Sequence, residues 1–330
     1  MRIIAEAIVL SRTREITEAG LFAALIAVLI IAAFYIPVIG SIMGMFLPLP
    51  VIILTMKNRP VYVVVSAIVA IILAGMAVTF ISSIALGGMA LIVGFPMGLA
   101  MKYKKNNLVT LLIGSICAAA GFFSVFSLIE LTTGISLMQT IETSFKMSMD
   151  MQADLTSAVE NLGVDSQASL EEAQKLMDSM LYLMKLVMPA ILMVMAMFYA
   201  AANLVFSHQI LKRLNIDRVP LGTFDQFRYP KHLAYGSLGM MLLAFILGYF
   251  KLVDAQLLSA NLAYLFAAIF SVQGMSLIYY WMKKRTGKAT GIVLLVLLVF
   301  VGMIQYIAFL GFFDVLMDIR KFEKKQDGVK

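Results

Sequence analysis

Charged residues are scarce in this sequence. They make up 14% of the 330 residues, whereas 62% are hydrophobic and the mean hydropathy is +0.94. Soluble domains carry about 25% charged residues, so a chain this apolar could not cover its surface in water. The sequence therefore predicts an integral membrane protein. The net charge of +7 does not indicate a nucleic-acid partner, because the basic residues lie between apolar runs, where they act as topology signals.

Residues that carry enzymatic or metal chemistry are also few. The single cysteine, Cys117, lies inside an apolar run, which excludes a disulfide framework and a CxxC redox or zinc pattern. His208 and His232 flank one loop and belong to no H-E-x-x-H motif. The segment TGKAT at 286–290 lacks the first glycine of a P-loop. We therefore expect no enzyme, no cofactor, and no ATP-driven step without another subunit.

Long apolar runs are abundant instead. A bilayer core about 30 Å thick needs roughly 20 apolar residues per helix. The runs predict an all-α fold, a polytopic transmembrane bundle of about nine spans with an extracytoplasmic helical hairpin between spans five and six. The expected spans are 19–37, 38–56, 61–80, 81–101, 107–131, 183–207, 233–253, 258–281 and 289–313.

The basic residues predict the orientation of the spans. Most of them fall in five blocks, at 2–14, 57–59, 102–105, 212–231 and 283–288, which share one side if the spans alternate. Because cytoplasmic loops are enriched in Lys and Arg, we expect a bacterial inner-membrane protein with a cytoplasmic amino terminus. Nine spans would leave the basic carboxyl-terminal tail outside. Either the last run is re-entrant, or an earlier span is wrong, or this tail departs from the rule.

The chain divides into three predicted parts: a five-span domain over 1–131, an outside insertion over 132–182, and a four-span domain over 183–330 with a basic loop at 208–232. The insertion is acidic, and its apolar residues recur at helical spacing. Gly163 is a plausible helix end, and Ser169 with Glu172 forms a capping-box pattern. We expect a helical hairpin whose second arm continues into the sixth span.

A methionine cluster lies in the first arm of this hairpin. Met147 and Met151 would share a helix face, while Met149 points away. Thioethers are soft ligands that suit Cu(I), so Met147 and Met151 are a candidate copper site. The alternative is that these methionines fill gaps between packed helices, as the other methionines of the chain would.

Polar residues at membrane depth are the default candidates for function. Glu130 ends the fifth span and Lys185 begins the sixth, and the two could form the rim of a pocket that binds a zwitterionic ligand. Asn261 and Gln273 lie in the eighth span as further substrate-binding candidates. The alternatives are that the charges mark helix ends and that the amides hold helices together. No charge lies in mid-span, which argues against an ion-coupled carrier.

Small residues line the first span. Ala19, Ala23 and Ala27 stand four apart, as do Gly20 and Ala24, so they form two adjacent strips. Between membrane helices, small residues permit close backbone approach. The strips therefore predict a helical neighbour, which is either within this chain or in another subunit.

The segment TREITEAGLFAALIAVL, which begins at residue 13, resembles the first helix of S-components of energy-coupling-factor transporters. In that family an Ala-x-x-x-Ala contacts the transmembrane coupling subunit, and Ala19 and Ala23 match its spacing. The similarity covers residues 13–131, where the Gly-rich fourth span adds to it. The resemblance implies micronutrient uptake energised by a partner. The extra spans and the outside hairpin depart from a six-span S-component.

The whole chain resembles the YybS-like family of predicted bacterial membrane proteins. The resemblance is carried by residues 189–236, which hold Asn203, Pro220, Phe224 and the run Phe-Arg-Tyr-Pro, and by FFDVLMDIRK near the carboxyl terminus. The family has no established activity, so the resemblance implies a membrane protein and no particular chemistry.

The basic loop at 208–232 alternates aromatic and basic residues. This pattern is typical of the membrane interface, where rings lie at headgroup depth and Arg or Lys faces anionic lipid. A docking surface for a partner is the alternative. The residues concerned are Arg213, Arg218, Phe227, Arg228 and Tyr229.

The sequence leaves three functional hypotheses. The first is a membrane protein that binds a small solute for uptake, with energy supplied by a transmembrane coupling subunit. The second is a non-transporting scaffold that acts through the outside hairpin, with a homo-oligomer or another protein as partner. The third is Cu(I) handling at the methionine cluster. Membrane lipid is a partner in every case.

Overall fold

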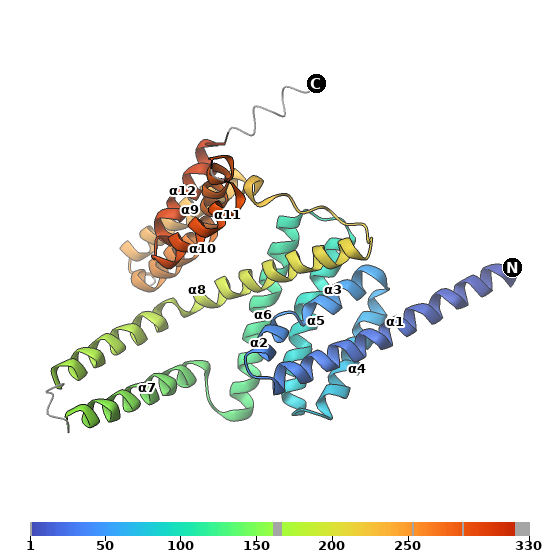
Figure 1. Ribbon diagram of the computed structural model, residues 1–330, viewed down its shortest axis with the longest axis horizontal. Helices are drawn as coiled ribbons and strands as arrows, with labels where there is room; N and C mark the ends of the chain where they lie inside the picture. The colour runs from blue at the N-terminus through green and yellow to red at the C-terminus, as the bar shows by residue number, and fades with distance from the viewer. Residues whose placement is uncertain (1, 161–166, 253, 286, 321–330) are drawn as a thin grey trace. The chain divides into compact units, whose positions relative to one another are not determined.

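A computed structural model describes residues 2–160, 167–252, 254–285 and 287–320 of the chain (Figure 1). All regular structure in these residues is helical, which confirms the all-α class. The helices form two compact units. Unit 1 comprises Met1–Met177 with Met195–Leu221, and unit 2 comprises Asp178–Val194 with Gly222–Lys330. These borders differ from the expected division at residues 131 and 182, because part of the sixth span belongs to each unit.

The helices of unit 1 follow the predicted apolar runs, although one run is divided into two helices. α8 is one helix that contributes to both units. The elements are α1 Arg2–Tyr35, α2 Ile39–Met45, α3 Pro48–Lys57, α4 Pro60–Gly75, α5 Phe80–Lys102, α6 Asn107–Thr133, α7 Leu137–Glu160 and α8 Gln167–Arg213.

The described residues contain seven helices that are long and apolar enough to cross a membrane, with α2 and α3 taken together as one. The second predicted span, 38–56, is divided into these two helices because Pro48, at the first position of α3, has no N–H to continue a helix. α4 is apolar but has only 16 residues. Seven long helices with three shorter apolar ones agree with a polytopic bundle.

Glycines on α5 bring the helices of unit 1 close together. A Cβ at Gly94 would lie 2.8 Å from the carbonyl oxygen of Pro48, and one at Gly98 would lie 2.6 Å from the Cβ of Thr55. Only glycine allows α5 to approach α3 at this distance. At the end of the contact, Lys102 donates to the carbonyls of Thr55 and Asn58, which satisfies groups at the carboxyl end of α3.

α8 runs without interruption from the predicted insertion through the sixth predicted span, as expected. Pro189 lies inside it. A side chain of unit 2 forms hydrogen bonds with the helix backbone beside this proline. The amide of Asn261 donates to the carbonyl of Leu186 at 2.7 Å and accepts from the N–H of Ala190 at 2.9 Å. These two backbone groups are one helical turn apart, so the Asn261 side chain bridges the ladder of α8.

Unit 2 is completed by the carboxyl-terminal helices. They are η1 Phe224–Gln226, α9 Lys231–Tyr249, α10 Ala255–Arg285, α11 Lys288–Phe300 and α12 Ile304–Met317. The single ninth span predicted over 289–313 is instead two short helices, α11 and α12. The turn between them contains Gly302 with φ of 82°, a left-handed conformation that glycine adopts readily.

The end of the described chain lies beside the basic end of α10. Arg320 donates to the carbonyl of Asp225, and the carboxylate of the same Asp225 binds Lys283. The chain has therefore returned, after α11 and α12, to the end of unit 2 where Lys283, Lys284 and Arg285 lie. We call this the basic end. A last run that is divided and returns in this way is compatible with the first of the three explanations for the tail, and re-entry into the membrane stays a prediction.

Candidate binding site at the basic end of unit 2

The segment 222–230 forms one wall of the basic end. It is extended apart from the single turn of η1, and Pro230 precedes α9 as its N-cap residue. A segment with so little regular structure must place its backbone polar groups against side chains or water. In unit 2 those side chains come from α10 and from the residues around α12.

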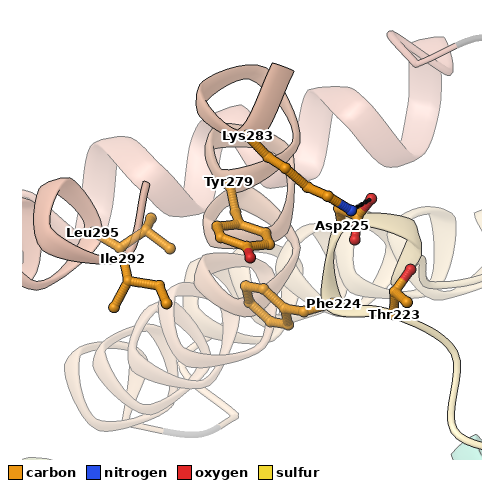
Figure 2. Close-up of a pocket in the computed structure, with 7 residues that line it drawn as sticks. All are labelled: Thr223, Phe224, Asp225, Tyr279, Lys283, Ile292 and Leu295. Carbon is orange, nitrogen blue, oxygen red and sulfur yellow. Dashed lines mark hydrogen bonds and ion pairs between the residues drawn. The ribbon is translucent and has the colours of Figure 1, made fainter. Parts of the chain in front are cut away.

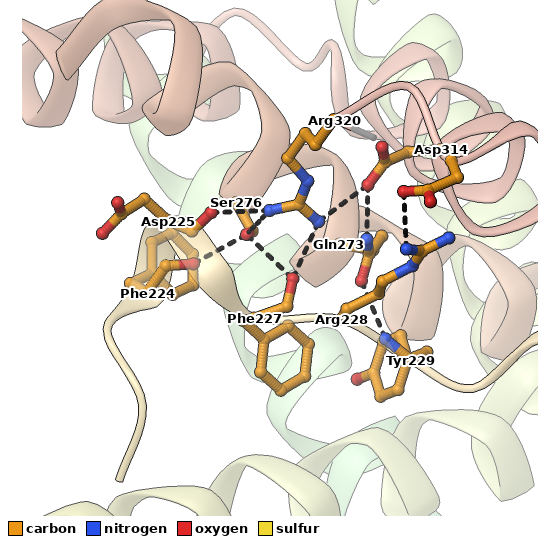
Figure 3. A network of polar contacts seen from close by, with 10 residues as sticks. Phe224, Asp225, Phe227, Arg228, Tyr229, Gln273, Ser276, Asp314 and Arg320 are labelled. Carbon is orange, nitrogen blue, oxygen red and sulfur yellow. Dashed lines mark hydrogen bonds and ion pairs between the residues drawn. The ribbon is translucent and has the colours of Figure 1, made fainter. Parts of the chain in front are cut away.

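Arg320 is the centre of the polar network that holds this segment (Figure 3). One guanidinium nitrogen donates to the carbonyl of Asp225 at 2.7 Å and to the hydroxyl of Ser276 at 2.9 Å. The other donates to the carbonyl of Phe227 at 2.8 Å and to the carboxylate of Asp314 at 2.7 Å. The planar fork of arginine suits such divergent acceptors. Arg320 thus joins the segment, α10 and α12.

Asp314 is almost completely buried, with 1% of its surface exposed. Its carboxylate accepts from Arg320 and from the side-chain amide of Gln273. The carbonyl of that amide accepts from the N–H of Tyr229 at 3.0 Å. A buried charge is tolerated when it is paired and hydrogen-bonded, and here both conditions are met.

Two further ion pairs border the network. Arg228 binds Asp318 at 2.5 Å, and Lys283 binds Asp225 at 2.8 Å. The hydrogen bond from Lys283 is the main reason that the pKa of the Asp225 carboxyl is lowered from its ordinary value, and it outweighs partial burial. Burial raises the pKa of the Tyr229 hydroxyl to about 12, so this ring is neutral at physiological pH.

A pocket opens beside the Lys283–Asp225 pair (Figure 2). Its volume is about 400 Å³, which lies within the range of small-molecule sites. Figure 2 shows Lys283 meeting Asp225 on one side, Ile292 and Leu295 on the opposite side, and two aromatic rings between them. The lining residues are Thr223, Phe224, Asp225, Tyr279, Lys283, Ile292 and Leu295.

A second cavity of about 500 Å³ lies between α9 and α10 near their connection, and its walls are almost entirely apolar. Its lining residues include two that carry a hydroxyl, Tyr249 and Ser259, and none with a charged side chain. Among the described residues, no group of three or more His, Cys, Asp or Glu side chains is arranged to hold a metal ion. The pocket at the basic end therefore has the richer chemistry.

Of the predicted substrate-binding residues, Gln273 and Asn261 lie in unit 2 and have structural partners. Gln273 belongs to the Arg320 network, and Asn261 bridges α8. Both amides therefore hold helices together, which was the alternative interpretation. Glu130 is exposed near the end of α6 in unit 1, and Lys185 is exposed on the part of α8 that belongs to unit 2.

The two small-residue strips of α1 have different surroundings. Ala19, Ala23 and Ala27 are buried, with 6%, 2% and 5% of their surface exposed, and the hydroxyl of Ser66 on α4 donates to the carbonyl of Ala19. This strip is thus covered by a helix of the same chain, and its assignment as a subunit-docking face is replaced by packing within unit 1. Gly20 and Ala24 are exposed, so a partner at that strip stays a prediction.

Of the five residues of the basic loop predicted to lie at a lipid or partner interface, three pack within unit 2 and two remain candidates. Tyr229 is buried within the protein: 8% of its surface is exposed, and the centroid of its ring lies 6.5 Å from that of Phe270. Arg228 forms an ion pair with Asp318, and the carbonyl of Phe227 accepts a hydrogen bond from Arg320. These three residues are held against unit 2, Phe227 and Tyr229 through their backbone groups and Arg228 through its side chain. Arg213 and Arg218, at the end of unit 1, remain candidates for the interface.

The methionine cluster lies on α7. Met147 and Met151 are 67% and 68% exposed, whereas Met149 is less so. Two exposed thioethers one helical turn apart are compatible with the copper hypothesis, which stays a prediction, as does the hairpin itself. Its connecting residues 161–166, with Gly163, lie outside the described residues, and so do the side chains of Ser169 and Glu172.

Sequence reasoning missed the residues that build the site: Asp225, Lys283, Asp314 and Arg320. A signal was present in Asp314, a lone acid within the apolar run LGFFDVLM, because an ionisable residue at membrane depth needs a partner. Its position one residue beyond the predicted span concealed it. The partner could not be chosen from sequence, since many basic residues were available.

Comparisons with known proteins agree with a membrane protein. A family model described as "Predicted membrane protein (DUF2232)" matches residues 24–315. The chain is also similar to the "Uncharacterized protein YybS" of Bacillus subtilis (strain 168), with 23% identity over 94% of this chain and 99% of that protein. No solved structure matches. The expected similarity to S-components is not shown by these comparisons and stays a prediction.

Proposed function

Since the chain belongs to the DUF2232 family of predicted membrane proteins, we propose that it is an integral membrane protein that binds a small solute in the pocket at the basic end of unit 2. The single observation that carries this proposal is the pocket of about 400 Å³ lined by an ion pair, two aromatic rings and two aliphatic side chains. Sites for small molecules combine mostly apolar walls with a few placed polar groups.

The network around Arg320 supports the same proposal. Segment 222–230 supplies Thr223, Phe224 and Asp225 to the pocket, and its carbonyls at Phe224, Asp225 and Phe227 accept hydrogen bonds from Ser276 or Arg320. A wall fixed in this way is organised before a ligand arrives, which lowers the entropic cost of binding.

We propose that the chain binds its solute without transforming it and contributes to uptake through a partner. The exposed strip of Gly20 and Ala24 on α1 offers a surface on which another helix can approach closely. The basic end would face the cytoplasm, as would the amino terminus, because Lys and Arg are enriched on that side. The membrane would be the bacterial inner membrane.

A second candidate function is a non-transporting scaffold. The close packing of unit 1 favours it, since α5 meets α3 through glycines and the buried residues of α1, α3 and α4 form one continuous cluster. In this alternative unit 1 is a rigid platform, and partners bind through the exposed faces of α7 and α8.

Replacing Leu295 by tryptophan tests solute binding. Leu295 is 9% exposed and lines the pocket, so the larger indole would occupy the ligand volume. We expect native mass spectrometry of the purified full chain to detect a retained small molecule that is lost in Leu295→Trp. Leu297→Trp is the matched control, because Leu297 lies on the same helix and is 55% exposed. An identical set of retained molecules in the wild type and both variants would contradict the proposal and favour the scaffold.

A further inference from the structure

The charged side of the pocket consists of one carboxylate and one ammonium group. Asp225 and Lys283 meet at 2.8 Å, and their side chains are 12% and 33% exposed. The pair is neutral as a whole. It is also placed where a ligand can reach it, because both residues line the pocket.

The charge of an acceptable ligand follows from this neutrality. A ligand with one net charge could pair with Lys283 or with Asp225, but the charge that it displaced would be left partly buried without compensation. An uncompensated buried charge is costly. A zwitterion avoids this cost, because its carboxylate pairs with Lys283 while its ammonium pairs with Asp225. The number of ion pairs then increases and the net charge of the site stays at zero.

The rest of the pocket selects an apolar body. Ile292 and Leu295 form the wall opposite the charged pair, and the rings of Phe224 and Tyr279 lie between with their centroids 5.9 Å apart (Figure 2). Aromatic rings favour edge or offset contact with another ring. They also attract a cation that lies over their faces. An ammonium group near Asp225 would therefore be stabilised by the carboxylate and by the aromatic rings.

We infer that the pocket takes a small zwitterion with an ammonium and a carboxylate group at one end and an apolar or aromatic group at the other, of about the size of an aromatic amino acid. The inference rests on the proposed function and names the substrate class of the same site. The charged end lies at Asp225 and Lys283, and the apolar group extends past the rings toward Ile292 and Leu295.

Three probes that share one aromatic ring test the inference on the full chain in detergent. They are L-phenylalanine, which is a zwitterion; 3-phenylpropionate, which has only the carboxylate; and phenethylamine, which has only the ammonium. We expect L-phenylalanine to bind at least about tenfold more tightly than either single-charge probe by isothermal titration calorimetry, since each of these lacks one charged hydrogen bond.

Single variants test whether Asp225 and Lys283 bind the charged groups of the ligand. Asp225→Asn and Lys283→Met should each weaken the binding of L-phenylalanine by about tenfold or more, whereas Lys284→Met, an exposed neighbour outside the pocket, should leave it unchanged. The fluorescence of Trp281, the single tryptophan, reports whether each variant keeps its thermal unfolding transition. The comparison of probes on the wild type needs no variant, so the inference remains testable if one variant fails to fold.

The outcomes separate this inference from the proposed function. If a single-charge probe binds as tightly as L-phenylalanine, or if no probe binds, the zwitterion class is wrong. The proposed function is then judged by the loss of retained molecules in Leu295→Trp. If L-phenylalanine binds preferentially but Asp225→Asn and Lys283→Met have no more effect than Lys284→Met, the placement of the charged end is wrong.

Discussion

Replacement of Arg320 by leucine is expected to destabilise unit 2 by about 3 to 5 kcal/mol, the usual cost of removing one partner of a buried ion pair. The Arg320 side chain is 0% exposed and its partner Asp314 is 1% exposed. Without the guanidinium, the Asp314 carboxylate would retain the amide of Gln273 as its one donor among the described side chains. The carbonyls of Asp225 and Phe227 would also lose a donor. Thermal unfolding in detergent, followed by the fluorescence of Trp281 on α10, measures the change.

Two further variants identify the cause. Arg320→Leu combined with Asp314→Leu should recover a large part of the loss, because replacing both partners of a buried pair by apolar residues is often nearly neutral. Recovery should be incomplete, since the carbonyls of Asp225 and Phe227 still lack the guanidinium as a donor. Arg285→Leu removes an exposed arginine from the same end and should change stability by less than about 0.5 kcal/mol. Equal effects of Arg320→Leu and Arg285→Leu would show that the network does not hold unit 2 together.

Substitution of the glycines where α10 and α12 cross is expected to have the second large effect. A Cβ at Gly274 would overlap the carbonyl oxygen of Ile307, and one at Gly311 would overlap the carbonyl oxygen of Phe270. Backbone atoms cannot rotate away as a side chain does, so the helices would have to separate. Gly274→Leu and Gly311→Leu should each cost about 3 kcal/mol or more, the upper end for overpacking.

The control for the glycine crossing lies on α9. A Cβ at Gly236 or Gly239 would meet no heavy atom within 4 Å. Gly239→Leu should therefore be neutral or stabilise its helix by up to about 1 kcal/mol, the difference in helix propensity. The separation of α10 from α12 would also move Asp314 away from Gln273, so ligand retention should fall in Gly311→Leu and not in Gly239→Leu. Similar melting temperatures for the two variants would contradict the close crossing.

Much of the fold could be predicted from the sequence because lipid imposes a simple rule: a spanning segment is a long apolar helix. α5, α6 and the continuity of α8 agree with that rule. The division of the last run could not be predicted in the same way. LVLLVFVGMIQYIAFL is apolar apart from Gln305, and within it Gly302 marks the turn. Glycine also occurs inside intact helices, as Gly274 and Gly311 show, so its presence alone does not locate a break.

The candidate site was less predictable than the fold. Polar residues within apolar runs, such as Gln273, could be recognised as unusual, but the partner of Gln273 is Asp314, 41 residues away in the sequence. Aromatic and basic alternation in segment 222–230 suggested a membrane interface. The burial of Tyr229 depends instead on a backbone hydrogen bond to Gln273, which no local pattern encodes. The small-residue strip of Ala19 was located correctly, while the choice of neighbour required the structure.

The central claim of this account is that the chain re-enters and returns after α11 and α12, so that Arg320 can hold the wall of the pocket at the basic end. Labelling with a membrane-impermeant thiol reagent tests it most directly, in a Cys117→Ser background with single cysteines introduced at Ile319, Lys284 or Asp254. Asp254 precedes α10, at the end opposite Lys284. We predict that Ile319→Cys is labelled from the same side of the membrane as Lys284→Cys. Labelling of Ile319→Cys from the side that labels Asp254→Cys would contradict the account.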